Sequence, residues 1–285
     1  MKPALERIAR KQVDKLWLQK ASDSAESMIK SDSEATIDKR VDRLFHNLRS
    51  IYAHCTQLTD SILPISGRGN ATDAIRQLES FLLSEPSKAA LLIFKLNKQI
   101  IALGTELTIY NMLNGANLEL DFCDISIYSM VRNVASGFFA ELNEKKNYIN
   151  IDNSYVKAHF DFQTIEVALY YIIENAVKYV LPNSKIHVSF ESTMDWEIVR
   201  FRMTSLYVDS SEVDRIFEEG YSGIESMKGG LHGKGLGMFQ ARHLTEMNGG
   251  TLTFVAGKHI KSRRDGLRYA ENVVVVKLPK DEDED

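Results

Sequence analysis

The sequence predicts an α+β protein in which an antiparallel helical hairpin precedes an α/β sandwich with a mixed sheet. Two observations predict this fold. Between about residues 37 and 110 the apolar residues recur at helical spacings, whereas after residue 115 short strand-like runs alternate with helical segments. The chain has 285 residues, enough for two domains at roughly 100–200 residues each. Interleaved strands and helices pack as a sheet covered by helices.

The first 34 residues are expected to precede both domains. Residues 3–20 carry apolar residues at the spacing of a short amphipathic helix, and residues 21–34 are rich in Ser, Asp and Glu. We interpret residues 1–34 as this N-terminal helix followed by a linker or a weak helix.

The strongest periodic signal lies in the next segment. Its apolar residues are separated alternately by four and three positions: Ile37, Val41, Leu44, Leu48, Ile51, Cys55, Leu58 and Ile62. This spacing is that of an a/d seam, so the segment is expected to be a helix that packs against other helices. Pro64 ends it.

A second long helix is expected to begin at Pro86, after a short helical piece over residues 72–83. The apolar stripe of this helix consists of Leu92, Leu96, Ile100, Leu103, Leu107 and Tyr110, and Asn114-Gly115 ends it. The two long helices form an antiparallel hairpin over residues 35–115. One hairpin cannot cover both of its apolar faces, so we expect a homodimer in which two hairpins form a four-helix bundle.

Residues 118–279 are predicted to form the second domain. Helices are expected over residues 125–144, 163–180 and 234–248. The expected strands are residues 148–152, 158–162, 185–190, 196–203, 251–255 and 273–278. Residues 280–285 are interpreted as a solvated acidic tail.

Composition restricts the partners and the compartment. The net charge of −4 gives no sign of a nucleic-acid-binding surface. No run approaches the roughly 18 apolar residues of a membrane helix, so no membrane insertion is expected. Cys55 and Cys123 fit no metal-binding or CxxC spacing. They are expected to be free thiols of a reducing cytosol, which predicts a cytoplasmic protein.

The first candidate site residues lie in the apolar helical segment from Tyr170 to Tyr179. Asn175 and Lys178 are three positions apart and therefore share a helix face. An amide oxygen can ligate Mg²⁺, an ammonium can meet phosphate oxygens, and Tyr179 can stack on a purine. The segment also fits a partly buried helix whose polar side chains simply face solvent.

The second candidate is the glycine run Leu231-His-Gly-Lys-Gly-Leu-Gly-Met238, which directly precedes a helical pattern. Glycine lets the backbone approach a phosphate, and a helix N-terminus offers free amides. Residues 220–230 before it are rich in Gly and Ser, as expected of a mobile lid. Alternating glycines occur in many loops, so this run is a weak signal by itself.

Order and spacing together are far more specific. The helix with Glu174-Asn-Ala-Val-Lys-Tyr179, then Arg215-Ile-Phe-Glu-Glu-Gly-Tyr221, a loop, the glycine run and Asn248-Gly-Gly250 resemble the ATP-binding domain of sensor histidine kinases. That domain belongs to the GHKL family, shared with type II topoisomerases, heat-shock chaperone ATPases and mismatch-repair ATPases. The resemblance covers about residues 118–279 and implies ATP and Mg²⁺ as cofactors. The residues that it implies in nucleotide binding are Asn175, which is also the Mg²⁺ ligand, Lys178, Tyr179, Phe217, Gly233, Gly235, Leu236 and Gly237.

The hairpin then supplies a candidate catalytic residue, because Phe45-His-Asn-Leu-Arg-Ser50 resembles the phosphoacceptor box of these kinases. With Val41 at a and Leu44 at d of the heptad, His46 falls at the outward-facing f position. His54 falls at g, nearer the seam. The resemblance implies that His46 takes the γ-phosphoryl group of Mg-ATP and passes it to an aspartate of a response-regulator receiver domain. A helical histidine also fits an ordinary surface residue.

Three features depart from the family pattern. The residue after the acceptor histidine is usually acidic, but here it is Asn47, which cannot act as a base. Tyr171 replaces the polar residue usually found four positions before the asparagine. The Asp-x-Gly-x-Gly box that reads the adenine amino group is missing. Met203 stands at its aspartate, and Ser205 and Tyr207 stand at its glycines.

These departures leave three functions open. The favoured one is an active protein histidine kinase. The second is a pseudokinase, or a histidine phosphotransfer protein on a kinase scaffold, with weak or no use of ATP. The third is a nucleotide-gated interaction module without phosphohistidine. No sensor domain is recognisable in the sequence, so an upstream sensor protein is a further expected partner.

Overall fold

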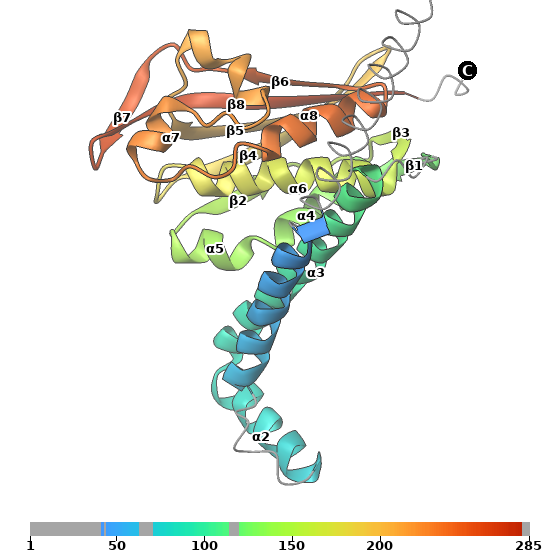
Figure 1. Ribbon diagram of the computed structural model, residues 1–285, viewed down its shortest axis with the longest axis vertical. Coiled ribbons are helices and arrows are strands. Elements are labelled where there is room, and N and C mark those ends of the chain that lie inside the picture. Colours follow the sequence, from blue (N-terminus) through green and yellow to red (C-terminus); the bar gives the residue numbers. More distant parts are fainter. Residues whose placement is uncertain (1–40, 43, 63–70, 114–119, 281–285) are drawn as a thin grey trace, which may run out of the picture.

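The computed structural model describes residues 41–42, 44–62, 71–113 and 120–280. A helical hairpin extends from one side of an α/β sandwich (Figure 1), which confirms the predicted α+β fold. The expected helix and linker over residues 1–34, the seam position Ile37 and the acidic residues 281–285 lie outside the described residues.

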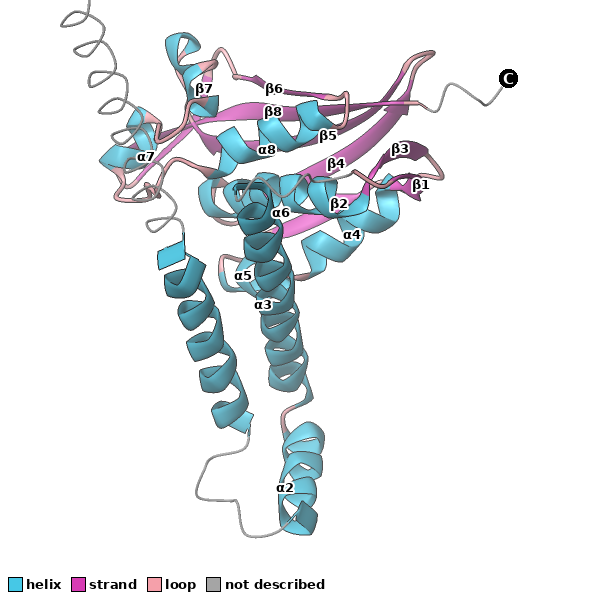
Figure 2. Cartoon of the chain, turned by 45° about the vertical axis from the view of Figure 1, so that its right-hand side comes forward, coloured by secondary structure: helices cyan, strands magenta, loops and turns pink. Residues whose placement is uncertain are grey.

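The hairpin pairs the helical residues 41–62, of which residue 43 is not described, with α3 (Pro86–Leu113). The two helices run side by side in opposite directions, and α2 (Ala71–Ser84) lies at the end far from the sandwich (Figures 1 and 2). The seam positions Val41, Leu44, Leu48, Ile51, Cys55, Leu58 and Ile62 are all half-buried. Most residues between them are exposed, as the a/d pattern predicts.

The first seven elements of the sandwich, in chain order, end with β4. They are β1 (Phe122–Ser126), α4 (Ile127–Ser136), α5 (Phe139–Glu144), β2 (Tyr148–Ile151), β3 (Lys157–Asp161), α6 (Phe162–Tyr179) and β4 (Lys185–Ser192). The following elements are β5 (Trp196–Leu206), the 3-10 helices η2 (Ser210–Glu212) and η3 (Arg215–Phe217), α7 (Ile224–Lys228), α8 (Gly237–Met247), β6 (Thr251–Val255), β7 (Ile260–Arg264) and β8 (Leu267–Pro279).

The main sheet is mixed, as predicted. Its strand order is β2-β4-β5-β8-β6, and β7 pairs with one end of β8. β2 and β4 are parallel, whereas the other neighbours are antiparallel. β1 and β3 form a separate two-stranded antiparallel sheet.

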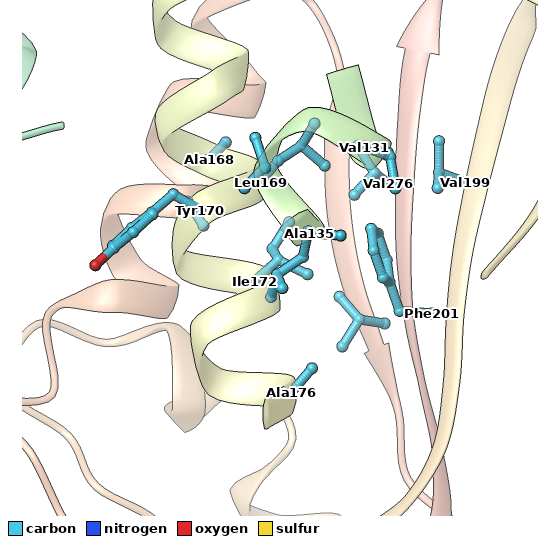
Figure 3. Close-up of a cluster of buried hydrophobic side chains, with 14 of the residues drawn as sticks. Val131, Ala135, Ala168, Leu169, Tyr170, Ile172, Ala176, Val199, Phe201 and Val276 are labelled. Carbon is cyan, nitrogen blue, oxygen red and sulfur yellow. The ribbon is translucent and has the colours of Figure 1, made fainter. Parts of the chain in front are cut away.

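The core lies between α6 and the main sheet. Along β5, Val199, Phe201 and Met203 are buried, whereas Arg202 on the alternate face is exposed. Figure 3 shows Phe201 and its sheet neighbours facing the apolar side of α6, whose Leu169 and other core residues are buried. This packing fixes α6 against the sheet.

Four parts of the sandwich differ from the expectations. The segment 125–144, expected to be one helix, contains the end of β1 and then α4 and α5. β1 exists because it pairs with β3, which is about 35 residues away, and local periodicity carries no sign of so distant a partner. The sequence also did not predict β7 and α7, and β8 begins at Leu267 instead of residue 273. β7 is mostly basic and exposed, so it lacks the apolar alternation of a half-buried strand.

Candidate functional site

A cavity of about 550 Å³ lies where α6, the end of β5 and the loop before α8 meet. This volume falls within the roughly 300–1,000 Å³ of small-molecule sites. The cavity is lined by polar residues of α6, by residues 233–238 of the glycine run, and by Met203 and residues 205–208. The structure therefore brings together the two segments that the sequence singled out.

α6 presents its polar residues to this cavity because its other faces are buried. Asp161 caps the helix by accepting a hydrogen bond from the Thr164 amide at 2.8 Å. Ten of the 18 helix residues are buried in the core. The residues that are left half-buried on the remaining flank and line the cavity are Tyr171, Glu174, Asn175, Lys178 and Tyr179. This flank unites the i and i+3 positions expected from the sequence.

The glycine run lies directly against this flank of α6. A Cβ atom at Gly237 would lie 3.2 Å from the Asn175 amide nitrogen, and one at Gly233 would lie 3.2 Å from the Lys178 ammonium. Gly235 has a φ of +68°, and a Cβ atom there would overlap the backbone of the preceding loop. Side chains at these positions would fill the space next to the amide and the ammonium, so glycine keeps that space open.

Two ammonium groups lie at this part of the cavity, although the whole chain has a net charge of −4. Lys178 and Lys234 line it, and among the described residues neither forms an ion pair. The described residues also contain no cluster of three or more His, Cys, Asp or Glu that would hold a metal ion. A magnesium ion at the Asn175 oxygen would therefore take waters and phosphate oxygens as its other ligands, as Mg²⁺ commonly does.

The hairpin reaches the same cavity. Asn47 from the first helix and Glu106 from α3 are among the lining residues, and His46, the neighbour of Asn47, is exposed. Glu174 of α6 lines the cavity together with these two hairpin residues. Burial raises the pKa of its carboxyl, and the nearby Lys98 offsets part of that rise. The cavity is therefore shared between the sandwich and the helix that carries the candidate phosphoacceptor.

The segment expected to be a mobile lid is anchored at two points. Glu212, which is buried, accepts hydrogen bonds of 2.8 Å from the Tyr221 hydroxyl and from the Ile224 amide. Glu225 in α7 is also buried and accepts bonds from the Arg268 amide at 2.9 Å and from its guanidinium at 2.7 Å. Burial alone would raise the pKa of Glu225, but the Arg268 bonds outweigh it and hold the pKa below the usual range. Two buried carboxylates thus fix this segment.

The end of β5 forms the apolar part of the cavity. Met203 is 4% exposed and lines the cavity, as do Ser205 and Tyr207, so the three replacements of the family's Asp-x-Gly-x-Gly box all lie in the site. Tyr179 lines the cavity and also packs against the buried cluster that contains Leu206. No carboxylate takes the place of the missing aspartate on this strand.

Of two further residues that the resemblance implies in nucleotide binding, one lines the cavity and the other does not. Leu236 lines the cavity, directly before the first residue of α8. Phe217 is buried in the core and is not a lining residue, and the Arg242 guanidinium lies 3.6 Å from the centre of its ring. His232, which precedes the first glycine of the run, is exposed and does not line the cavity.

Several lining residues escaped the sequence analysis. Glu174 is a charged residue inside an apolar helix, and this contrast could have predicted that it lines a site. Glu106 carries no such signal, because it reaches the cavity only through the packing of α3 against the sandwich. Ser226 lies in the segment 220–230, and nothing in the sequence distinguishes it from its neighbours. The anchoring roles of Glu212 and Glu225 likewise follow only from their hydrogen-bond partners in the structure.

The fold is an α/β sandwich with a cavity at one end of its sheet. Residues 161–282, which are less than half of the chain, match the family described as histidine kinase-, DNA gyrase B- and HSP90-like ATPase. No match was found among the curated proteins.

Solved structures of histidine kinases are similar to this chain. The catalytic domain of histidine kinase ThkA has 18% identity and a TM-score of 0.45, covering 56% of this chain and 99% of that one. The Acinetobacter baumannii histidine kinase AdeS has 15% identity and a TM-score of 0.46, covering 83% of this chain and 98% of that one. Full-length ShkA in complex with AMPPNP has 18% identity and a TM-score of 0.48, covering 82% of this chain and 45% of that one.

None of the described helices is long and apolar enough to cross a membrane.

Proposed function

We propose that this chain is a dimeric protein histidine kinase of the two-component type. In this proposal His46 is autophosphorylated from Mg-ATP, and the phosphoryl group then passes to an aspartate of a response-regulator receiver domain. One observation carries the proposal: the cavity lined by Asn175, Lys178 and the glycine run is also lined by Asn47, the neighbour of His46. A nucleotide site and a helical histidine thus adjoin each other.

The residues of the cavity fit ATP and magnesium. The cradle that Gly233, Gly235 and Gly237 keep open lies beside the Lys178 ammonium and the Asn175 amide. Lys178 and the backbone amides at the start of α8 would bind phosphate oxygens, and the Asn175 oxygen would ligate the metal. When bound, the metal neutralises the charge that develops on the phosphate oxygens during transfer.

His46 would supply the nucleophile. A neutral imidazole has a ring nitrogen with a free lone pair, which would form the bond to the γ-phosphorus as the bond to the leaving oxygen breaks. Asn47 cannot accept the proton that the imidazole loses. Because His46 is exposed, that proton would pass to solvent. The same exposure would let a receiver domain reach the phosphohistidine.

The proposed dimer rests on apolar surface that the single chain leaves uncovered. On α3 the exposed residues include Ile93, Ile100, Leu103 and Leu107, of which Ile100 is 67% exposed. They recur at heptad spacing along one stripe, opposite the face that packs on the sandwich. A second hairpin would cover this stripe together with the half-buried seam of the first helix. The proposed domains remain residues 1–34, 35–115 and 118–279, followed by the tail 280–285.

The proposed compartment is the cytoplasm. Cys55 and Cys123 are both free thiols in the structure, as a reducing compartment allows. An upstream sensor protein is the proposed source of the signal.

A second candidate is a phosphotransfer protein or pseudokinase built on the same scaffold. The observation that favours it is Met203, which lies in the cavity where the family has an aspartate, together with Asn47 in place of an acid. Such a protein would retain the dimer and His46 but receive its phosphoryl group from another protein.

The test is incubation of the purified chain with Mg²⁺ and γ-labelled ATP, beside His46→Gln and the matched control His54→Gln. We expect label that is stable to base and labile to acid in the wild type and in the control, and none in His46→Gln. Equal labelling of His46→Gln would refute the assignment of the acceptor. A folded, dimeric wild type without any label would refute the active kinase and favour the phosphotransfer protein.

A further inference from the structure

A buried serine occupies the apolar end of the cavity. Ser205 is 5% exposed, lines the cavity, and is fixed by its ladder pairing with Ala270 and its bridge to Val180. We propose that Ser205 is the base-reading residue of this site, and that it recognises a purine by donating a hydrogen bond to a ring nitrogen. The inference rests on the proposed binding of ATP and adds how its base is selected.

The hydrogen bonds around Asn272 determine what Ser205 can do. Asn272 is fully buried, and its Oδ1 accepts from the Gly257 amide at 2.9 Å, which can only donate. Its Nδ2 donates to the Leu206 carbonyl at 2.9 Å, which can only accept. The orientation of this amide is therefore fixed. The second bond of Nδ2, at 2.8 Å to Ser205 Oγ, makes the serine oxygen an acceptor.

The hydrogen of the Ser205 hydroxyl is consequently left to donate. Among the described residues no acceptor takes it, and the cavity is the space that the hydroxyl borders. A buried donor without a partner costs free energy, so a ligand acceptor placed there is favoured. The site thus presents one donor at this point.

The same end of the cavity lacks a strong acceptor for an amino group. Met203 lies directly opposite Asn272 in the β5–β8 ladder, and its thioether is only a weak acceptor. From Met203 to Val208 no lining residue carries a carboxylate. This strand therefore offers the exocyclic amine no charged acceptor.

Polarity decides which part of a nucleotide would occupy this end. Lys178 and the glycine run line the basic part, whereas Met203, Phe254 and Val274 line the apolar part. A phosphate chain belongs with the ammonium and a flat aromatic base with the apolar side chains. Purines carry ring nitrogens that accept hydrogen bonds whether or not they bear a 6-amino group. The site should therefore bind a purine triphosphate that lacks this group as well as it binds ATP.

The test measures Mg²⁺-dependent affinity by calorimetry for ATP, purine riboside 5′-triphosphate and the 1-, 3- and 7-deaza analogues of ATP. The variants are Ser205→Ala, Met203→Asp and the control Thr204→Ala, whose side chain does not line the cavity. For the wild type we expect ATP and purine riboside triphosphate to bind within about 3-fold, since no charged acceptor reads the amine. Ser205→Ala should weaken ATP about 3- to 10-fold, as loss of one neutral hydrogen bond does, and Thr204→Ala should not.

The analogues identify the contact. One deaza analogue should bind the wild type more weakly than ATP does, and this difference should vanish in Ser205→Ala. Met203→Asp, where it folds, should favour ATP over purine riboside triphosphate about 10-fold or more, because it adds a charged acceptor. A wild type that already shows such a preference, or Ser205→Ala with unchanged affinity, would overturn the role of Ser205 while leaving ATP binding intact. Absence of any nucleotide binding by the folded chain would overturn the proposed function itself, and this inference with it.

Discussion

The sandwich and the hairpin differ in how completely each covers its own apolar surface. α6 alone buries ten of its 18 residues, and the core extends through the sheet to residues such as Phe201 and Leu278. By contrast, α2 has no buried residue, and the described residues of the first helix are at most half-buried. The sandwich is therefore complete as a single chain, whereas the hairpin has the exposed apolar stripe of an element that is completed by association.

α3 belongs to both regions. The difference in how the two regions cover their apolar surfaces therefore bears on function. Its Ile101 and Ile109 are part of the sandwich core, and Asn97 donates a 3.0 Å hydrogen bond to Ser136 at the end of α4. Lys98 forms an ion pair with Glu141 of α5. One face of α3 is thus fixed to the sandwich, while the opposite stripe remains open. A partner that covers the stripe would act directly on a helix that lines the cavity through Glu106.

The largest effect is expected from a cavity in the sandwich core. Phe201 is fully buried between α6 and the sheet (Figure 3), so Phe201→Ala should lower the free energy of unfolding by about 3–5 kcal/mol. Denaturant titration followed by circular dichroism measures it. Arg202→Ala, on the exposed face of the same strand, is the control and should change stability by less than about 0.5 kcal/mol. Similar losses for the two variants would contradict a core centred on this face.

An intermediate effect is expected on the open stripe of α3. Ile100→Asp places a charge in the proposed dimer seam and should weaken the dimer about 100-fold or more, because a buried, unpaired charge is costly. The sandwich should keep its unfolding midpoint, since Ile100 is 67% exposed in the single chain. Light scattering over a concentration series measures the association. Ser87→Asp, also on α3 but outside the stripe, should remain dimeric; a dimer that survives Ile100→Asp would place the interface elsewhere.

The same contrast explains how much the sequence could predict. The long helices, α6 and the glycine run follow from local periods and local motifs, and the structure contains them. What local patterns missed depends on distant partners or on charge. β1 needs β3, and the basic strand β7 is held by pairing with β8 and by the Lys261–Glu271 ion pair. In the site, the shared helix face of Asn175 and Lys178 could be predicted from their spacing of three residues. The contribution of Glu106 could not, because the tertiary packing of α3 alone brings it to the cavity.

The smallest effect, and the most local, is expected at the anchor of the loop over the cavity. The pKa of Glu225 is held below the usual range by Arg268, so its carboxylate stabilises the anchored loop above the ordinary pKa of a glutamate. That stabilisation should be lost as the pH falls through the lowered pKa of the folded protein. Glu225→Gln should remove most of it already at pH 7.

Hydrogen-exchange protection factors of the Met227, Gly229 and Gly230 amides, corrected for intrinsic rates, report on this anchor because each amide donates within the α7 turn. At pH 7 we expect about 10-fold lower protection in Glu225→Gln than in the wild type, since a charge-assisted bond is lost. The two proteins should converge in acid, where the wild-type carboxyl is also neutral. Glu246→Gln, an exposed acid of α8, is the control and should match the wild type throughout. A difference between Glu225→Gln and wild type that persists unchanged into acid would mean that packing, and not the carboxylate charge, holds the loop.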